Sequence, residues 1–238
     1  MRLLRSGPDP LDPGRAGFAH RGLHRPGVPE NSLAAFSAAL EMSAGIECDL
    51  RLSADGEAMV FHDPDLRRLC DLRLTIEATP AALLMGQRLL ETSEALPRLF
   101  DLLNLIGGAV PLLLELKTRD GNADRLAAAV AFDLNLYSGE VGVMSFDPRV
   151  GAWLARHRPD LRRGLVVSGG DSMFTRWWKM RRARPHFLAV KLSELSRPWA
   201  HRARSKMPLY TWTVCTTTDR ETAVVHADAL IWEADGRP

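Results

Sequence analysis

Two histidines, three carboxylates and an Arg/Lys pair stand where short apolar runs of this chain end. They are His20 and His62, then Glu47, Asp49 and Glu115, and finally Arg21 and Lys117. Three carboxylates offer the oxygen ligands that Mg²⁺ or Ca²⁺ prefers. Two histidines can accept and donate protons near neutral pH, and Arg with Lys suits an anion such as a phosphate. The set predicts metal-assisted cleavage of a phosphodiester.

The spacing of these residues predicts that they share one face of their strands. Side chains alternate along a strand, so Glu47 and Asp49 point one way and Cys48 points the other. Glu115 and Lys117 likewise share a face. Inward acids on apolar strands are costly without a cation, so we expect a metal site. The alternative is that each carboxylate is neutralised by a basic neighbour in a plain ion pair.

A charge count supports the metal interpretation. Three carboxylates and one phosphodiester carry four negative charges, which a divalent cation, Arg21 and Lys117 together balance in a partly desolvated site. Gly22 is expected to permit a close backbone approach or a positive φ. Glu30 and Asn31 are expected to orient the site. The other histidines lack a comparable setting and are expected to be ordinary surface or core residues: His24, His157, His186, His201 and His226.

Short apolar runs alternate with amphipathic stretches, which indicates βα units and a parallel sheet. The expected strands are Ala16–His20, Gly45–Leu50, Val110–Lys117, Val141–Ser145, Gly164–Ser168, Phe187–Lys191, Pro208–Val214 and Ala229–Trp232. Eight strands can close a TIM-type (β/α)8 barrel, whose carboxyl-end rim carries the active site. The expected helices include Ser32–Ser43, Glu94–Ile106, Ala123–Leu134, Pro148–Arg156 and Thr218–His226. Asn31 or Ser32 is the expected N-cap of the first.

A ninth apolar run, Glu57–His62, does not fit this alternation. Asp55-Gly56 before it is a strong turn signal, so we expect a hairpin that extends the second barrel strand. Antiparallel pairing about the turn would place His62 roughly opposite Glu47, beside the carboxylates. The stretch 67–93 is expected to form an excursion before the next barrel helix.

The bulk properties narrow the class of protein. At 238 residues the chain suits one catalytic domain, 16–238, after an irregular lead-in, 1–15. The net charge of +2 is not the strong positive excess that is typical of nucleic-acid-binding proteins. Three scattered cysteines argue against a disulfide framework or a zinc knuckle. With no apolar signal segment and no long apolar span, a cytoplasmic enzyme is expected.

Six motifs in a fixed order resemble the glycerophosphodiester phosphodiesterase family, a phosphatidylinositol-phospholipase-C-like barrel. They are His20-Arg21-Gly22, Pro29-Glu30-Asn31-Ser32, Glu47-Cys48-Asp49, His62-Asp63, Leu114-Glu115-Leu116-Lys117 and Tyr210-Thr211-Trp212-Thr213-Val214. The resemblance, from about residue 16 to 214, implies hydrolysis of glycerophosphodiesters to glycerol 3-phosphate and an alcohol. It implies catalytic roles for His20 and His62 and a metal bound by Glu47, Asp49 and Glu115. It also implies that Trp212 lines the substrate pocket; ordinary barrel packing of this tryptophan is the alternative.

The pattern departs from that family near its end. Cys215 stands where the family usually has Asn, and the chain reads Trp232-Glu233-Ala234-Asp235 where a Thr-Asp-x-Pro turn is usual. No final barrel helix is expected. The core there must be covered by residues 1–14 or by a partner subunit, which leaves an oligomer open.

The segment 173–184 combines Met, Phe and Trp with five basic residues. It is expected either to be a barrel-coat helix with a solvated basic face or to make a weak contact with a membrane surface. The second interpretation would favour a lysophospholipase D or sphingomyelinase D-like activity at the same site. A non-catalytic phosphate-binding module is the remaining alternative; such a module usually lacks a histidine or a carboxylate that this chain keeps.

Overall fold

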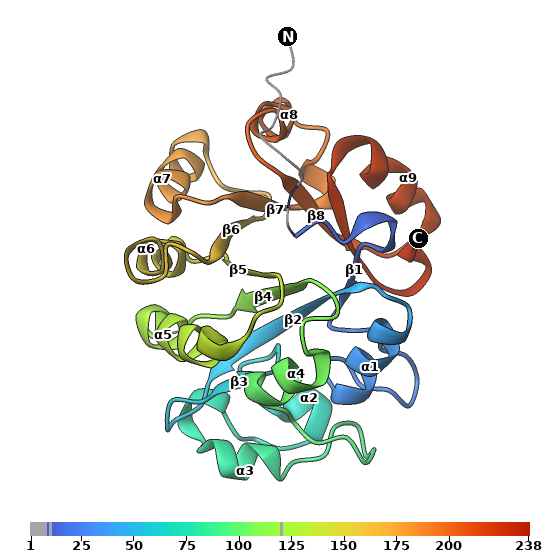
Figure 1. Cartoon of the computed structure of the whole chain (residues 1–238), viewed down its shortest axis with the longest axis vertical. Helices are drawn as coiled ribbons and strands as arrows, with labels where there is room; N and C mark the ends of the chain where they lie inside the picture. Colours follow the sequence, from blue (N-terminus) through green and yellow to red (C-terminus); the bar gives the residue numbers. More distant parts are fainter. Residues whose placement is uncertain (1–8, 10, 120) are drawn as a thin grey trace.

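The computed structural model describes residues 9, 11–119 and 121–238, and its centre is a closed ring of eight parallel strands (Figure 1). The ring consists of β1 (Phe18–His20), β2 (Gly45–Leu52), β4 (Leu112–Leu116), β5 (Val141–Ser145), β6 (Arg162–Val167), β7 (Phe187–Lys191), β8 (Leu209–Val214) and β9 (Ala229–Trp232). Each strand pairs with its neighbour in this order, and β1 pairs with both β2 and β9 to close the ring. The prediction of a (β/α)8 barrel is confirmed.

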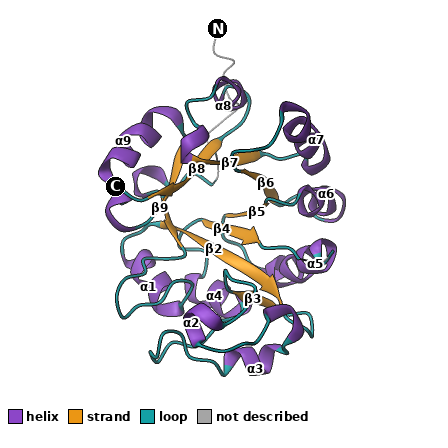
Figure 2. Ribbon diagram, turned by 180° about the vertical axis from the view of Figure 1, so that it is seen from behind, coloured by secondary structure: helices purple, strands orange, loops and turns teal. Residues whose placement is uncertain are grey.

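Helices surround the ring, as Figure 2 shows. They are α1 (Leu33–Glu41), α2 (Arg67–Cys70), α3 (Ala81–Met85), α4 (Leu99–Ile106), α5 (Ala123–Asp133), α6 (Pro148–His157), α7 (Met173–Ala183), α8 (Pro198–Arg204) and α9 (Thr217–His226). Ser32 caps α1 by accepting a hydrogen bond from the Ala35 amide. The expected start at Glu94 is wrong, because α4 begins only after Pro97. The sequence pattern gives no prediction for α8, which is short and starts at a proline.

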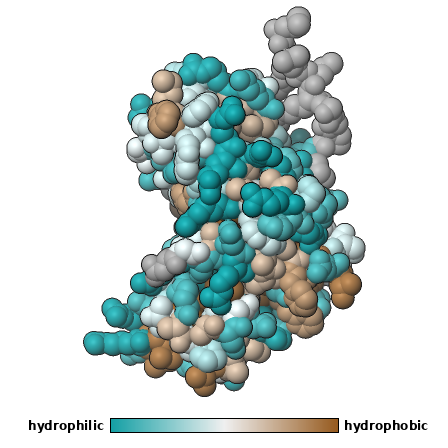
Figure 3. All heavy atoms as spheres, turned by 90° about the vertical axis from the view of Figure 1, so that its left-hand side faces the viewer, coloured by the Kyte–Doolittle hydropathy of each residue, from teal (hydrophilic) through white to brown (hydrophobic). Residues whose placement is uncertain are grey.

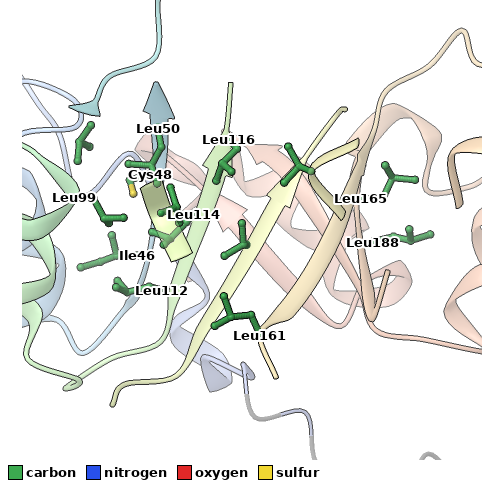
Figure 4. Packing of buried hydrophobic residues seen from close by; sticks show 14 of the residues in the cluster. Ile46, Cys48, Leu50, Leu99, Leu112, Leu114, Leu116, Leu161, Leu165 and Leu188 are labelled. Atoms are coloured by element: carbon green, nitrogen blue, oxygen red, sulfur yellow. The ribbon is translucent and has the colours of Figure 1, made fainter. Parts of the chain in front are cut away.

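The outer face of the barrel packs through a layer of leucines against these helices, except α2 and α3, which belong to a separate apolar cluster (Figure 4). Cys48, Leu114 and Leu116 lie in this layer and are almost fully buried, as their alternation with Glu47, Asp49 and Glu115 predicts. Each buried leucine contributes roughly 1.5–3 kcal/mol. Burial of the apolar face therefore sets which face of β2 and β4 carries the acids.

The inside of the barrel is filled at its amino end. Leu11 is fully buried among barrel-lining side chains that include Phe18, Phe187 and Tyr210. Asp9 accepts a hydrogen bond from the Tyr210 hydroxyl at 2.5 Å and pairs with Arg162 at 2.5 Å. Residues 9 and 11 therefore plug the end opposite the expected site.

The last strand is covered within a single chain. Among the described residues no α-helix follows β9, yet Leu230 and Trp232 are 8% and 1% exposed. The Trp232 indole donates a hydrogen bond to the Ala16 carbonyl at 2.7 Å, so the segment that precedes β1 lies over the end of β9. A partner subunit is therefore not needed to cover this strand.

The hairpin is confirmed as well. β3 (Ala58–Val60) runs antiparallel to β2 outside the ring, with Val60 opposite Leu50. The Phe61 amide donates to the Asp49 carbonyl at 3.0 Å, so His62 continues opposite Cys48, one position from where the sequence predicts it. The excursion after β3 has a small apolar core of its own, including Leu66, Ile76 and Leu84. None of the helices described has both the length and the apolar character required to cross a bilayer.

Candidate active site

Three carboxylates meet at the carboxyl ends of two adjacent strands. Asp49 on β2 is in register with Glu115 on β4, and Glu47 stands two residues earlier on the same face of β2. All three are buried, and one oxygen of each lies within 4.8 Å of the others. Because neighbouring carboxylates repel, burial and Asp49 raise the pKa of Glu47 to about 8, and burial raises that of Glu115.

Two basic side chains offset this charge in part. Lys117 Nζ lies 2.6 Å from Glu115 Oε1 and 3.1 Å from Asp49 Oδ1, and Arg21 Nε lies 3.0 Å from Asp49 Oδ2. Burial alone would raise the pKa of Asp49, but Lys117 and Arg21 outweigh it and hold this pKa well below the usual range. The ion pairs expected as the alternative to a metal site therefore form, but the three buried carboxylates still outnumber the two basic side chains.

The donor set fits a hard divalent cation. Asp49 Oδ1 is buried and, despite its closeness to Lys117, accepts no hydrogen bond from any residue that the structure describes. An oxygen with unused lone pairs beside two more carboxylates is what such a cation requires. Glu47, Asp49 and Glu115 are therefore the residues that would hold it.

His20, at the end of β1, is held by a carboxylate that the sequence analysis does not assign to the site. Its Nδ1 lies 2.7 Å from Glu233 Oε2, and its Nε2 lies 4.0 Å from Glu47 Oε2. Burial opposes charge on His20, but Glu233 and Glu47 raise its pKa above the ordinary value. Since the Glu233 carboxylate can only accept, Nδ1 is the donor and Nε2 is turned toward the acids.

Glu233 connects the two places where the sequence departs from the family pattern, Cys215 and the segment 232–235. The Cys215 thiol donates to Glu233 Oε1 at 3.5 Å, and Glu233 follows β9 directly. His24, which sequence reasoning leaves outside the site, also lies here, with Nε2 3.5 Å from Glu233 Oε2. Glu233 directly follows the expected strand Ala229–Trp232, and this position is the signal that could have identified it.

His62, after β3, is held in the same way. Its Nδ1 lies 2.8 Å from Asp63 Oδ1, and the side chain is 32% exposed. Burial lowers its pKa and Asp49 opposes that shift only in part. Arg68 of α2 binds the other oxygen of Asp63 at 2.6 Å through Nε. Both histidines are thus oriented through Nδ1 by a carboxylate.

The motif from Glu30 to Ser32 positions Arg21 and Asp49. Asn31 donates to Asp49 Oδ2 at 3.0 Å and has a positive φ of 55°, so Asn31 orients the acid and Ser32 is the cap. Glu30 accepts from Arg21 Nη1 at 2.8 Å. At Gly22, φ is 78° and a Cβ would lie 2.8 Å from the Ala35 backbone. Both expectations for this glycine are confirmed.

Trp212 lies toward the carboxyl end of β8 and is connected to Lys117 through the Phe146 ring. Its indole donates to the Ala189 carbonyl at 3.1 Å and meets Phe146 edge-on at 5.6 Å, and Lys117 Nζ lies 5.8 Å from the Phe146 ring. Regular alternation along β8 would put Val214 on the same face as Trp212, but the structure does not. A register shift between Thr211 and Val214 interrupts the alternation, and Val214 packs with the outer core.

Comparisons with solved structures agree with this architecture. A phosphodiesterase of Oleispira antarctica, in complex with the product sn-glycerol-3-phosphate, superposes with a TM-score of 0.80 at 24% identity over 90% of this chain and 91% of that one. A glycerophosphodiester phosphodiesterase of Thermotoga maritima gives a TM-score of 0.77 at 22% identity over 92% and 94%. At this level of identity the likeness shows the fold.

Sequence comparisons are more specific but shorter. A glycerophosphodiester phosphodiesterase of Caldanaerobacter subterraneus is 37% identical over 99 residues, 38% of this chain and 40% of the relative. One of Bacillus altitudinis is 44% identical over 57 residues, 24% and 23%. The matched stretches thus span less than half of each curated relative. The model of the Glycerophosphoryl diester phosphodiesterase family matches residues 20–232, and the chain therefore belongs to this family.

Proposed function

We propose that the protein hydrolyses glycerophosphodiesters to glycerol 3-phosphate and an alcohol, with a divalent cation, Mg²⁺ or Ca²⁺, as cofactor. One observation carries the proposal: three buried carboxylates converge near two histidines, each oriented through Nδ1 by its own carboxylate. Family membership supports the same reaction. The Oleispira antarctica relative holds sn-glycerol-3-phosphate, which is the product proposed here.

The reaction needs the phosphate to be held and its charge offset. A cation bound by Glu47, Asp49 and Glu115 would supply Lewis-acid polarisation of the phosphate. Arg21 and Lys117 would bind the phosphate oxygens, and both already face the acids. Trp212 would line the substrate pocket at the mouth of the barrel.

Proton transfer falls to the histidines. One activates the nucleophile, either water or the 2-hydroxyl of the glycerol, and the other protonates the leaving alcohol. Glu233 and Asp63 keep the Nδ1 proton of His20 and of His62 in place, which leaves each Nε2 for the substrate. The geometry permits either division of roles.

The test is release of glycerol 3-phosphate from glycerophosphocholine and glycerophosphoethanolamine, with Mg²⁺, Ca²⁺ or EDTA present. We expect release that requires a cation and stops with EDTA. Release that EDTA leaves unchanged would contradict the metal assignment. No release with any cation would contradict the substrate class.

A second candidate substrate is a lysophospholipid or a sphingolipid, cleaved at the same site. Exposed apolar side chains on α7, among them Phe174 at 71% and Trp177 at 54%, favour it. The KM of a series of lysolipids would then fall as the acyl chain lengthens. A KM independent of chain length would leave the water-soluble diesters as the substrates.

A further inference from the structure

The helix α7 exposes most of its apolar side chains. Met173, Phe174, Trp177 and Trp178 are 82%, 71%, 54% and 46% exposed, and Phe174 stacks on Trp177 with 5.8 Å between ring centres. We name these four residues the α7 apolar face. On this helix of 11 residues only Ala183 is buried. The aromatic residues of α7 therefore do not serve the core.

The neighbouring helix shows what a coat helix of this barrel normally does. α6 buries Pro148, Val150, Gly151 and Leu154 against the barrel, and its last turn is basic. Contiguous exposed apolar side chains of the kind α7 presents mark a surface for interaction. The chain's own packing gives no reason for two adjacent exposed tryptophans.

The charge around the α7 apolar face is mostly positive, although Asp171, just before the helix, pairs with Lys179 at 2.9 Å. Of the 31 Lys and Arg residues in the chain, ten lie between residues 173 and 206, together with a single acid, Glu194. Arg181 lies 5.4 Å from the Trp177 ring and Arg182 lies 5.7 Å from that of Trp178. Arg176 stacks on Trp199 of α8 at 4.2 Å, so α7 and α8 form one basic surface.

The position of this surface relates it to the candidate active site. The segment 168–172 leads from the carboxyl end of β6 into α7, so Met173 and Phe174 lie at the end of the barrel that carries the site. Figure 3 shows apolar atoms exposed at the level of α7, on the upper left of that view. A surface that contacts α7 would lie beside the barrel mouth.

We propose that the α7 apolar face docks the protein on an anionic lipid surface. Phe, Trp and Met would enter the boundary between headgroups and acyl chains, while the Arg and Lys residues meet anionic headgroups. Aromatic rings flanked by mainly positive charge match both the apolar and the electrostatic character of such an interface. The inference goes beyond the proposed reaction, and its test needs no turnover.

The test is co-sedimentation of the full chain with vesicles of phosphatidylcholine, alone or mixed with phosphatidylglycerol. We expect binding only to the anionic vesicles, weakened by salt. The double variant Phe174→Ser/Trp177→Ser should bind at least about tenfold more weakly, with unchanged melting temperature. Phe132→Ser/Leu136→Ser is the matched control. These side chains are 76% and 99% exposed but lie at or just after the carboxyl end of α5, not on α7, so this variant should bind like the wild type.

A separate charge variant, Arg181→Glu/Arg182→Glu, should lose binding to anionic vesicles while it keeps the apolar face. Absence of binding by the wild type would overturn the proposal. Binding that Phe174→Ser/Trp177→Ser retains as fully as the control variant would also overturn it. Self-association in light scattering that is lost only in Phe174→Ser/Trp177→Ser, without vesicle binding, would assign the surface to a second copy of the chain instead.

Discussion

Arg68 donates hydrogen bonds to both carboxylate oxygens of Glu30, from Nη1 at 2.8 Å and from Nη2 at 2.7 Å, although the two residues are 38 positions apart in the chain. The same guanidinium binds Asp63 at 2.6 Å through Nε. Asp63 orients His62, and Glu30 pairs with Arg21. One side chain of the excursion thus connects a candidate acid/base residue to a candidate phosphate ligand.

Replacing Arg68 should therefore disturb the site from outside it. We expect Arg68→Gln to lower kcat/KM by roughly tenfold, in line with other residues that orient functional groups through one intermediary. Arg68→Lys should not restore activity, because an ammonium cannot reproduce the three-way fork. Arg67→Gln is the control, because the Arg67 side chain is 67% exposed and its ion pair among the described residues is with Asp65, at 3.7 Å. Equal activity of the two Gln variants would contradict the role of Arg68.

The two histidines should be required for turnover but not for folding. We expect His20→Ala and His62→Ala each to lower kcat by about 10²–10⁴-fold, the usual contribution of a general acid or base. Their circular dichroism and melting temperature should match those of the wild type. His157→Ala, an exposed histidine on α6, should be fully active. Wild-type kcat in either site variant would remove that histidine from the mechanism.

Glu233 should affect catalysis through His20. The carboxylate raises the pKa of His20 against the opposing effect of burial, so Glu233→Gln should lower this pKa. The limb of the pH–rate profile that His20 governs should then move to lower pH, and kcat should fall by about 10–100-fold. A reduced rate with an unmoved profile would indicate a merely structural role. Asp235→Asn, two residues further on and exposed, should change neither quantity.

Cation binding can be tested without turnover. Burial and Asp49 disfavour the charge on Glu47, so metal-free Glu47→Gln should melt at or above the wild-type temperature. At about 100 times its Kd, a cation stabilises by about 2.7 kcal/mol, or about 5–10 °C for a domain of this size. We expect this shift in the wild type and in the exposed control Glu140→Gln, and not in Glu47→Gln. A shift kept by Glu47→Gln would place the cation elsewhere.

The barrel strands are predictable because they are buried on both faces, so their apolar runs stand out between polar segments. The central residues of the site are predictable for a related reason, because charged residues such as Asp49 and Glu115 interrupt those apolar runs near their carboxyl ends. Contacts between residues that are far apart in the sequence cannot be predicted in this way. Nothing local marks Arg68 as the partner of Glu30, and the register shift before Val214 leaves no trace in the alternation.

Away from the site, Asp133 at the end of α5 makes stability depend on pH. Burial, and then Glu57, raise the pKa of Asp133 to about 6. A carboxyl with a raised folded-state pKa stabilises most when protonated: that contribution is complete below the unfolded value of about 3.9 and is lost as pH rises through 6. At pH 8 the folded protein therefore holds a carboxylate that it disfavours.

Asp133→Asn should remove this penalty. At pH 8 we expect a gain in the free energy of unfolding on the order of 1 kcal/mol, after allowance for the partial exposure of the side chain. The gain should shrink as pH falls to 5, because wild-type Asp133 then binds its proton in the folded state. Urea unfolding at both pH values measures the difference. Glu221→Gln, an exposed carboxylate on α9, should show no such trend, and a gain that is equal at pH 5 and pH 8 would mean that the pKa of Asp133 is not raised.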